Sequence, residues 1–198
     1  MYRELPRSLK IAHTSYVAVL VPAYWRHYGP GNFLWFSDLA LIGMVPALWR
    51  EDRRLVSALA LSALLPEVPW NLGYVTRLFT GRELFGLSHY MFDPRKPYWL
   101  RAFSLFHVWL PPLLLWSVRR LGYDRHMFRL QVLAGEAVLA ASYALTRPEE
   151  NVNWVYGPGE KPQRKIPRGV YLCGVMLFFP LFVWWPTHRI LRRLWSKP

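Results

Sequence analysis

Six apolar runs, separated by polar segments, constrain the fold of this chain more than any other feature. Each run approaches the roughly 20 residues that an α-helix needs to cross about 30 Å of hydrocarbon. Helices suit such runs because each bonds its own backbone N–H and C=O groups, for which lipid offers no partners. We therefore predict an all-α fold, an integral membrane bundle of about six transmembrane helices in a single domain over residues 1–198. The predicted spans cover about residues 11–27, 33–49, 55–78, 99–118, 127–146 and 169–190.

Aromatic and basic residues occupy the ends of these runs. The chain holds 11 Trp, and several stand where headgroups would lie, as in the aromatic belts of membrane proteins. Its net charge of +13 comes from Lys and Arg in loops, which favours lipid headgroups over nucleic acid. We expect membrane lipids as partners, leave other membrane proteins open, and expect no nucleic acid. A small excess of Lys and Arg in the second and fourth loops and at both ends favours cytoplasmic termini.

Glu67 lies deep in the third run, where a carboxylate costs about 3 kcal/mol or more and usually has a function. Pro66 and Pro69 stand close to it and predict a kink with room for a polar pocket, because proline frees helix carbonyls. Asn71 follows Glu67 by one helical turn on the same face. A hydrogen bond between helices explains this pair as well as a site does.

Other polar groups fall on the same side of the predicted membrane. Ser37 and Asp38 lie near the start of the second run, beside the first loop, and His107 lies in the first half of the fourth run, beside the third loop. Asn153 and Trp154 belong to the fifth loop. Alternate loops share a side, and the charge bias makes this the non-cytoplasmic side. We therefore predict one buried polar site in the non-cytoplasmic half of the bilayer.

The chemistry of these groups is compatible with acyl transfer. Ser37 is a candidate nucleophile if His107 reaches it, because a neutral His can act as a general base when its other ring nitrogen is held. Asp38 or Glu67 could hold that nitrogen. The chain lacks a G-x-S-x-G elbow around Ser37, and a hydroxyl bonded back to its own helix also explains this serine. The candidate substrate-binding residues are Glu67, Asn71, Asn153 and Trp154. Either Asn71 or Asn153 could donate a hydrogen bond to the oxyanion.

Metal ligands are not arranged in any recognisable pattern. Cys173 is the one cysteine, so a Cys-based site within one chain is excluded. No two His have the i, i+4 spacing of a helical ligand pair. We expect neither a metal nor another cofactor.

Several longer strings in the chain together resemble a known group of proteins. They are YGPGNFLWFSDLAL, LSHYMFD, RAFSLFHVWLP, LGYDRH and ENVNWVYGPG. They resemble an uncharacterised group of bacterial multi-pass inner-membrane proteins, over about residues 24–190. This resemblance implies a bacterial inner (plasma) membrane location.

Three short motifs are similar, in order, to those of the bacterial YwaF-type membrane proteins. They are Phe36-Ser37-Asp38, Phe106-His107 and Asn153-Trp154, where those proteins carry Cys-Asp, a mid-chain His and a late Asn-Tyr. That wider set is similar to animal membrane acyltransferases and to the androgen-induced threonine hydrolases of lipid esters. The similarity implies Ser37 as nucleophile, in place of Cys or Thr, and His107 as base.

Three classes of function are consistent with these observations. The leading one is a lipid-acyl hydrolase or acyltransferase that uses Ser37 and His107. The second is a non-enzymatic membrane subunit that binds lipid, pigment or quinone, or that scaffolds other membrane proteins. The third is a small transporter or channel in which Glu67 carries protons or binds a cation. The sequence alone leaves open whether the protein is an enzyme.

Overall fold

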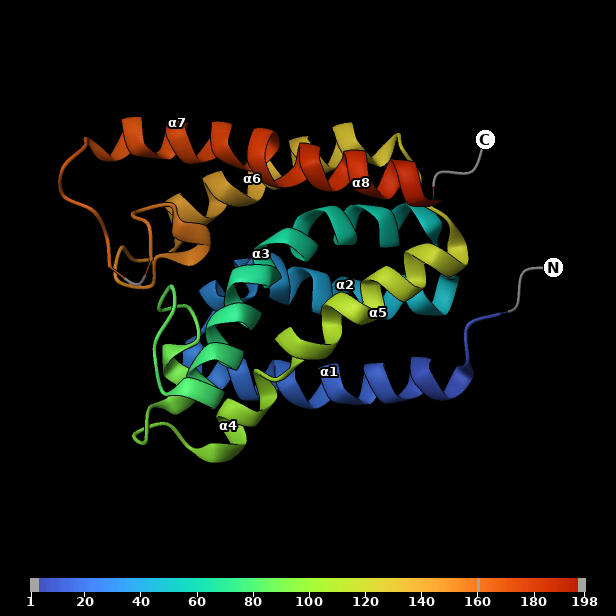
Figure 1. Cartoon of the computed structure of the whole chain (residues 1–198), viewed down its shortest axis with the longest axis horizontal. Helices are drawn as coiled ribbons and strands as arrows, with labels where there is room; N and C mark the ends of the chain where they lie inside the picture. Colours follow the sequence, from blue (N-terminus) through green and yellow to red (C-terminus); the bar gives the residue numbers. More distant parts are fainter. Residues whose placement is uncertain (1–3, 160, 196–198) are drawn as a thin grey trace.

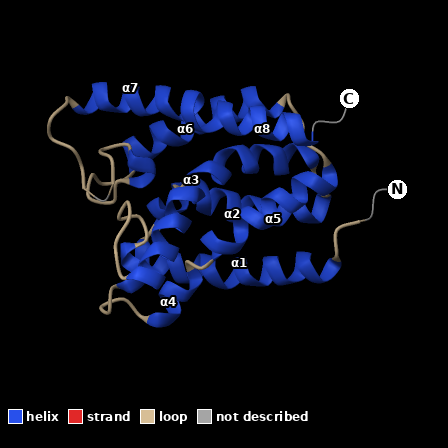
Figure 2. Cartoon of the chain, viewed as in Figure 1, coloured by secondary structure: helices blue, strands red, loops and turns tan. Residues whose placement is uncertain are grey.

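The computed structural model describes residues 4–159 and 161–195, and this part of the chain is helical, without β-strands (Figure 2). The predicted all-α fold is therefore confirmed. The α-helices are α1 (Arg7–Tyr28), α2 (Phe36–Arg50), α3 (Arg53–Thr80), α4 (Tyr98–Phe103), α5 (Phe106–Leu121), α6 (Met127–Leu145), α7 (Arg168–Phe178) and α8 (Trp185–Trp195). Short 3-10 helices are η1 (Pro30–Leu34), η2 (His89–Phe92) and η3 (Val152–Trp154), and a π-helical segment, η4 (Phe179–Trp184), joins α7 to α8.

Two helices in the described residues are long and apolar enough to cross a membrane: α3 (Arg53–Thr80) and the continuous helix Arg168–Trp195 formed by α7, η4 and α8. The helices α2 and α5 contain 15 and 16 residues. At about 1.5 Å per residue they are shorter than the roughly 30 Å of hydrocarbon. The six-span bundle is therefore not confirmed by helix length and composition, and it stays a prediction.

The helix α3 is the centre of the packing. It contacts α2 and α5 on one side and α6, η4 and α8 on the other. Figure 1 shows α1 along one edge of the molecule and α6, α7 and α8 along the opposite edge, with α2, α3 and α5 between them. The figure also shows α3 bending along its length, and two prolines lie inside it, Pro66 and Pro69. Proline removes a helix hydrogen bond and clashes with the preceding turn, which accounts for the bend.

Both ends of the described chain lie at one end of the bundle, while the segments 81–97 and 146–167 lie at the other (Figure 1). The start of α2 and the start of α5 are also at this second end, because each follows a connection from it. Polar residues near those helix starts are therefore brought into one region.

A close contact fixes the distance between α6 and the last long helix. A Cβ built on Gly135 of α6 would lie 2.2 Å from Cη2 of Trp184, whose side chain is fully buried. Only a residue without a side chain fits there, because the indole has no room to retreat in a packed interior.

We predict that Gly135→Val destabilises the protein by about 1–3 kcal/mol or more through overpacking. Thermal unfolding of the detergent-solubilised protein measures this as a lower Tm. Gly174→Val in α7 is the matched control, because a Cβ there meets no atom within 4 Å. Equal Tm values for the two variants would contradict the tight α6–Trp184 contact.

Candidate functional site

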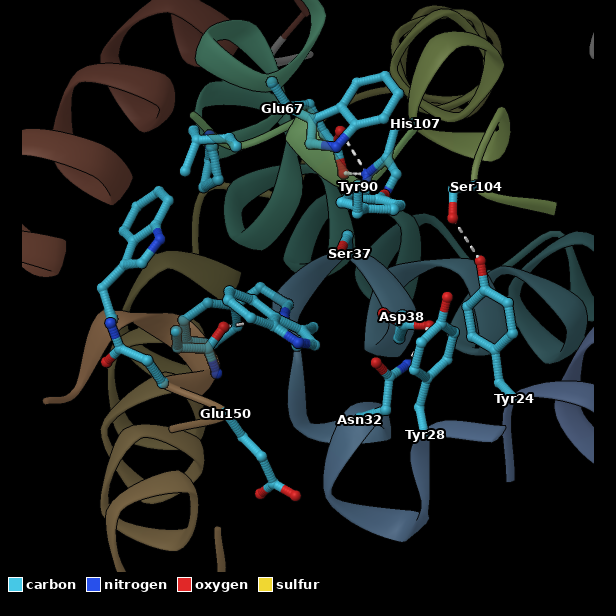
Figure 3. Close-up of a pocket in the computed structure, with 18 of the residues that line it drawn as sticks. Tyr24, Tyr28, Asn32, Ser37, Asp38, Glu67, Tyr90, Ser104, His107 and Glu150 are labelled. Atoms are coloured by element: carbon cyan, nitrogen blue, oxygen red, sulfur yellow. Dashed lines mark hydrogen bonds and ion pairs between the residues drawn. The ribbon is translucent and has the colours of Figure 1, made fainter. Parts of the chain in front are cut away.

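A cavity of about 370 Å³ lies at the end of the bundle that holds the segments 81–97 and 146–167, here called the loop end (Figure 3). Its wall comes from the end of α1, from η1 and the first turn of α2, from the middle of α3, from residues around η2 and the start of α5, and from η3 with its neighbours. These segments are distant in sequence, so the cavity exists only in the folded chain. Of the seven predicted site residues, the six that line it are Ser37, Asp38, Glu67, His107, Asn153 and Trp154.

A buried pair, Glu67 of α3 and His107 of α5, forms one wall. Nδ1 of His107 lies 2.9 Å from both carboxylate oxygens of Glu67. The side chain of Glu67 is 3% exposed and that of His107 is 13% exposed. A carboxylate can only accept hydrogen bonds, so Nδ1 carries the proton and Nε2 of a neutral ring keeps its lone pair. Nε2 makes no hydrogen bond to the residues described here, which is the state that a general base requires.

Two aromatic rings hold the imidazole in place. Trp70 stacks on His107 with ring centroids 4.4 Å apart and 25° between the planes, and Phe106 stacks on it at 4.1 Å and 28°. Trp70 itself stacks on Tyr74, one turn further along α3. This stacking restricts rotation of the imidazole ring and keeps Nδ1 directed at the Glu67 carboxylate.

Asn71 is not part of the cavity wall. Its side-chain amide donates to the backbone carbonyls of Glu67, at 2.9 Å, and of His107, at 2.8 Å. It therefore joins α3 to α5 directly behind the Glu67–His107 pair. This is the interhelical hydrogen bond that the sequence left open, and it uses the N–H groups that an oxyanion donor would need.

Asn153 lines the cavity, but its amide is also fully engaged. Its Oδ1 accepts from the backbone N–H of Phe36 at 3.1 Å, and its Nδ2 donates to the carbonyl of Leu34 and to Oγ of Ser142. The backbone of Asn153 has φ +51°, in the left-handed region that Asn tolerates better than most residues. Asn153 thus clamps the start of α2, and an oxyanion-donor role does not fit this arrangement.

The clamp positions Ser37 and Asp38 in the first turn of α2. In the view of Figure 3, Ser37 lies between the Glu67–His107 pair and Asp38. Asp38 is 4% exposed, and its one side-chain hydrogen bond comes from Asn32 Nδ2 at 3.4 Å. It makes no hydrogen bond to His107, so Glu67 is the carboxylate that orients the imidazole.

The sequence reasoning missed several residues of the wall. Tyr24 and Ser104 share a 2.7 Å hydrogen bond between Oγ and the phenol, and Nζ of Lys96 lies 5.0 Å from the ring centroid of Tyr28 and 5.3 Å from that of Tyr90. The tyrosines belong to a sequence rich in aromatic residues, which the membrane-belt pattern explains without a site. Lys96, Glu149 and Glu150, which also line the cavity, come from loops whose path the apolar pattern does not predict.

Within the described residues, no group of three or more His, Cys, Asp or Glu is arranged to hold a metal ion. No protein-family model matches the chain, and neither the curated proteins nor the solved structures contain a match to it. The resemblance to the YwaF-type proteins therefore stays a prediction.

We predict that Glu67 and His107 stabilise the fold as a coupled pair. Glu67→Leu and His107→Leu should each destabilise the protein by about 1–3 kcal/mol, because each leaves a buried partner without its hydrogen bond. The loss of unfolding free energy in the double variant should be smaller than the sum of the two single losses, with a coupling energy of at least about 0.5 kcal/mol. Thermal or denaturant unfolding in detergent measures the cycle, and additive losses would contradict the pairing.

Proposed function

We propose that this protein is a multi-pass membrane protein that acts as an acyl hydrolase or acyltransferase on ester lipids. The observation that supports it most is the Glu67–His107 pair, which leaves Nε2 as a base on the wall of a cavity that Ser37 also lines. A carboxylate, an imidazole and a hydroxyl in these roles form the nucleophile–base–orienter arrangement of acyl-transfer enzymes.

The chemistry assigns one role to each group. The Ser37 hydroxyl oxygen attacks the ester carbonyl carbon while its proton passes to Nε2 of His107. The tetrahedral intermediate then breaks the bond to the alcohol oxygen, which leaves with that proton. A water or an acceptor hydroxyl, deprotonated by His107 in turn, attacks the acyl-serine. The bond to Ser37 Oγ then breaks, this oxygen takes the proton back from His107, and a fatty acid or a new ester is released. Glu67 stabilises the imidazolium that forms in both halves of the reaction.

Backbone groups are better placed than either asparagine to stabilise the oxyanion. Phe36, Ser37 and Asp38 form the first turn of α2, where N–H groups lack acceptors within the helix. Asn153 takes the N–H of Phe36. The N–H of Ser37 itself is therefore the proposed donor, and the positive end of the helix dipole favours negative charge there.

The surface of α3 supports a membrane setting with lateral entry of the substrate. Five apolar residues that are 37–54% exposed lie along α3: Leu65, Val68, Leu72, Val75 and Leu78. A continuous apolar surface of this kind fits lipid better than water. We place the cavity in the non-cytoplasmic half of a bacterial inner membrane, with both termini in the cytoplasm, from the charge bias and the resemblance described above.

A fluorophosphonate lipid probe tests this proposal. We expect the wild-type protein in detergent to be labelled and the Ser37→Ala protein not to be labelled. The His107→Ala protein should react at least about 10²-fold more slowly than the wild type. Ser104→Ala is the matched control, because Ser104 lines the same cavity but bonds to Tyr24, and it should label like the wild type.

A second readout makes the test independent of how the probe fits. Fatty-acid release from ester lipids in mixed micelles should follow the same order of variants. Unchanged labelling and release in Ser37→Ala would exclude Ser37 as the nucleophile. A folded wild-type protein that neither labels nor releases fatty acid would instead favour the non-enzymatic lipid-binding function.

A further inference from the structure

The charges that face the cavity are unequal. Among the described residues, four carboxylates line it, from Asp38, Glu67, Glu149 and Glu150, against the ammonium of Lys96. Glu67 is committed to His107. Glu149 and Glu150 are exposed, whereas Asp38 is buried. A ligand that enters this cavity therefore meets an excess of negative charge, which disfavours an anionic group and favours a cation.

Asp38 has unused capacity to bind a donor. Its carboxylate can accept about four hydrogen bonds, yet its donors are its own backbone N–H and Asn32, which lies at 3.4 Å, beyond ordinary hydrogen-bond length. The neighbouring phenols do not supply more. The Tyr24 hydroxyl pairs with Ser104, and the buried Tyr28 hydroxyl has no hydrogen-bond partner. A buried carboxylate with so few donors is costly unless a charged or donating group joins it.

Aromatic faces surround this end of the cavity. Tyr24 and Tyr28 line it, and Figure 3 shows Asp38 beside both, whereas Tyr90 lies closer to the Glu67–His107 pair. The ammonium of Lys96 already lies over two of these rings, at 5.0 Å from Tyr28 and 5.3 Å from Tyr90. Aromatic faces with a nearby carboxylate are the groups that recognise ammonium ligands, and the chain's own lysine shows that these rings accept one.

We propose that Asp38 and the tyrosine rings around it bind the ammonium group of an amine-bearing lipid headgroup. The identity of the ligand as a lipid rests on the proposed function, while the preference for an ammonium group rests on the cavity itself. Asp38 is then a specificity residue, and Glu67 alone supports the base. The headgroup lies at the Asp38 end, and the ester is presented towards Ser37.

Binding measurements with matched lipids test the proposal. The Ser37→Ala protein, which prevents turnover, is titrated in detergent with lysophosphatidylethanolamine, lysophosphatidylglycerol and monoacylglycerol that carry the same acyl chain, and Kd is measured by intrinsic Trp fluorescence. We expect the ethanolamine lipid to bind at least about 10-fold more tightly than either of the other two, as one charge-assisted hydrogen bond predicts. Equal Kd values for the three lipids would overturn the proposal.

Two variants in the same background localise the effect. Asp38→Asn keeps the shape and removes the charge, so the preference for the ethanolamine lipid should disappear. Asp93→Asn removes an equal charge outside the cavity and should retain the preference. Hydrogen bonds from Arg95 engage Asp93 and lower its pKa to about 2. A preference that survives Asp38→Asn unchanged would also overturn the proposal.

Soluble phosphoethanolamine separates the two sources of an ammonium group. If it binds as tightly as the lysolipid, the ligand is a small amine and the lipid part of the proposal fails. Labelling of the wild-type protein reports on the proposed function separately, because the binding titrations are made without Ser37. Labelling of the wild type together with an ethanolamine preference that Asp38→Asn removes supports both conclusions, and labelling of the wild type with an unchanged preference removes only this one.

Discussion

The contact between Glu67 and His107 is the interaction on which the candidate site depends. A carboxylate that is 3% exposed needs a charged or donating partner, and this one finds its partner on another helix. The same two residues are joined a second time, through their carbonyls, by Asn71. The register of α3 against α5 is therefore fixed by polar groups at the cavity and by apolar packing elsewhere. Glu67 lies beside the two prolines of α3, and it lines the same cavity as His107 and the start of α2.

Asn71 and Asn153 hold backbone segments together and have no donor left for a ligand in the cavity. Asn153 secures the start of α2 from the loop after α6, and Asn71 links two helices. Asn153 pairs a backbone N–H at the start of α2, and Asn71 pairs the carbonyl of His107, for which Pro111 four residues later offers no N–H. As a consequence, Ser37 is presented on a rigid helix start, and its position relative to His107 depends on contacts between segments that are far apart in sequence.

The sequence predicts the helices well because long apolar runs can pair most of their own backbone groups as helices, and prolines such as Pro66 and Pro69 bend α3 without ending it. It also predicts that Asp38, Glu67 and His107 belong to one end of the bundle, because alternate loops share a side. It could not predict which carboxylate pairs with His107, since that choice depends on the helix rotation set by Asn71 and by the stacking of Trp70. The sequence also could not predict that Asn153 binds the start of α2, because a loop residue with a left-handed backbone belongs to no periodic pattern. The number of membrane crossings stays a prediction, because α2 and α5 contain 15 and 16 residues, fewer than the predicted spans 33–49 and 99–118.

The size of the cavity constrains how a lipid could use it. About 370 Å³ is near the lower end of the 300–1,000 Å³ that small-molecule pockets span. That space suits a headgroup and the ester beside it, and it is too small for the acyl chains as well. The chains must then lie outside, and the exposed apolar face of α3 adjoins the wall that Glu67 and Trp70 form. Headgroup recognition at Asp38 and chain contact along α3 would hold the ester between them, so the polar end of the ligand would determine specificity, while the bilayer itself would accommodate chains of different length.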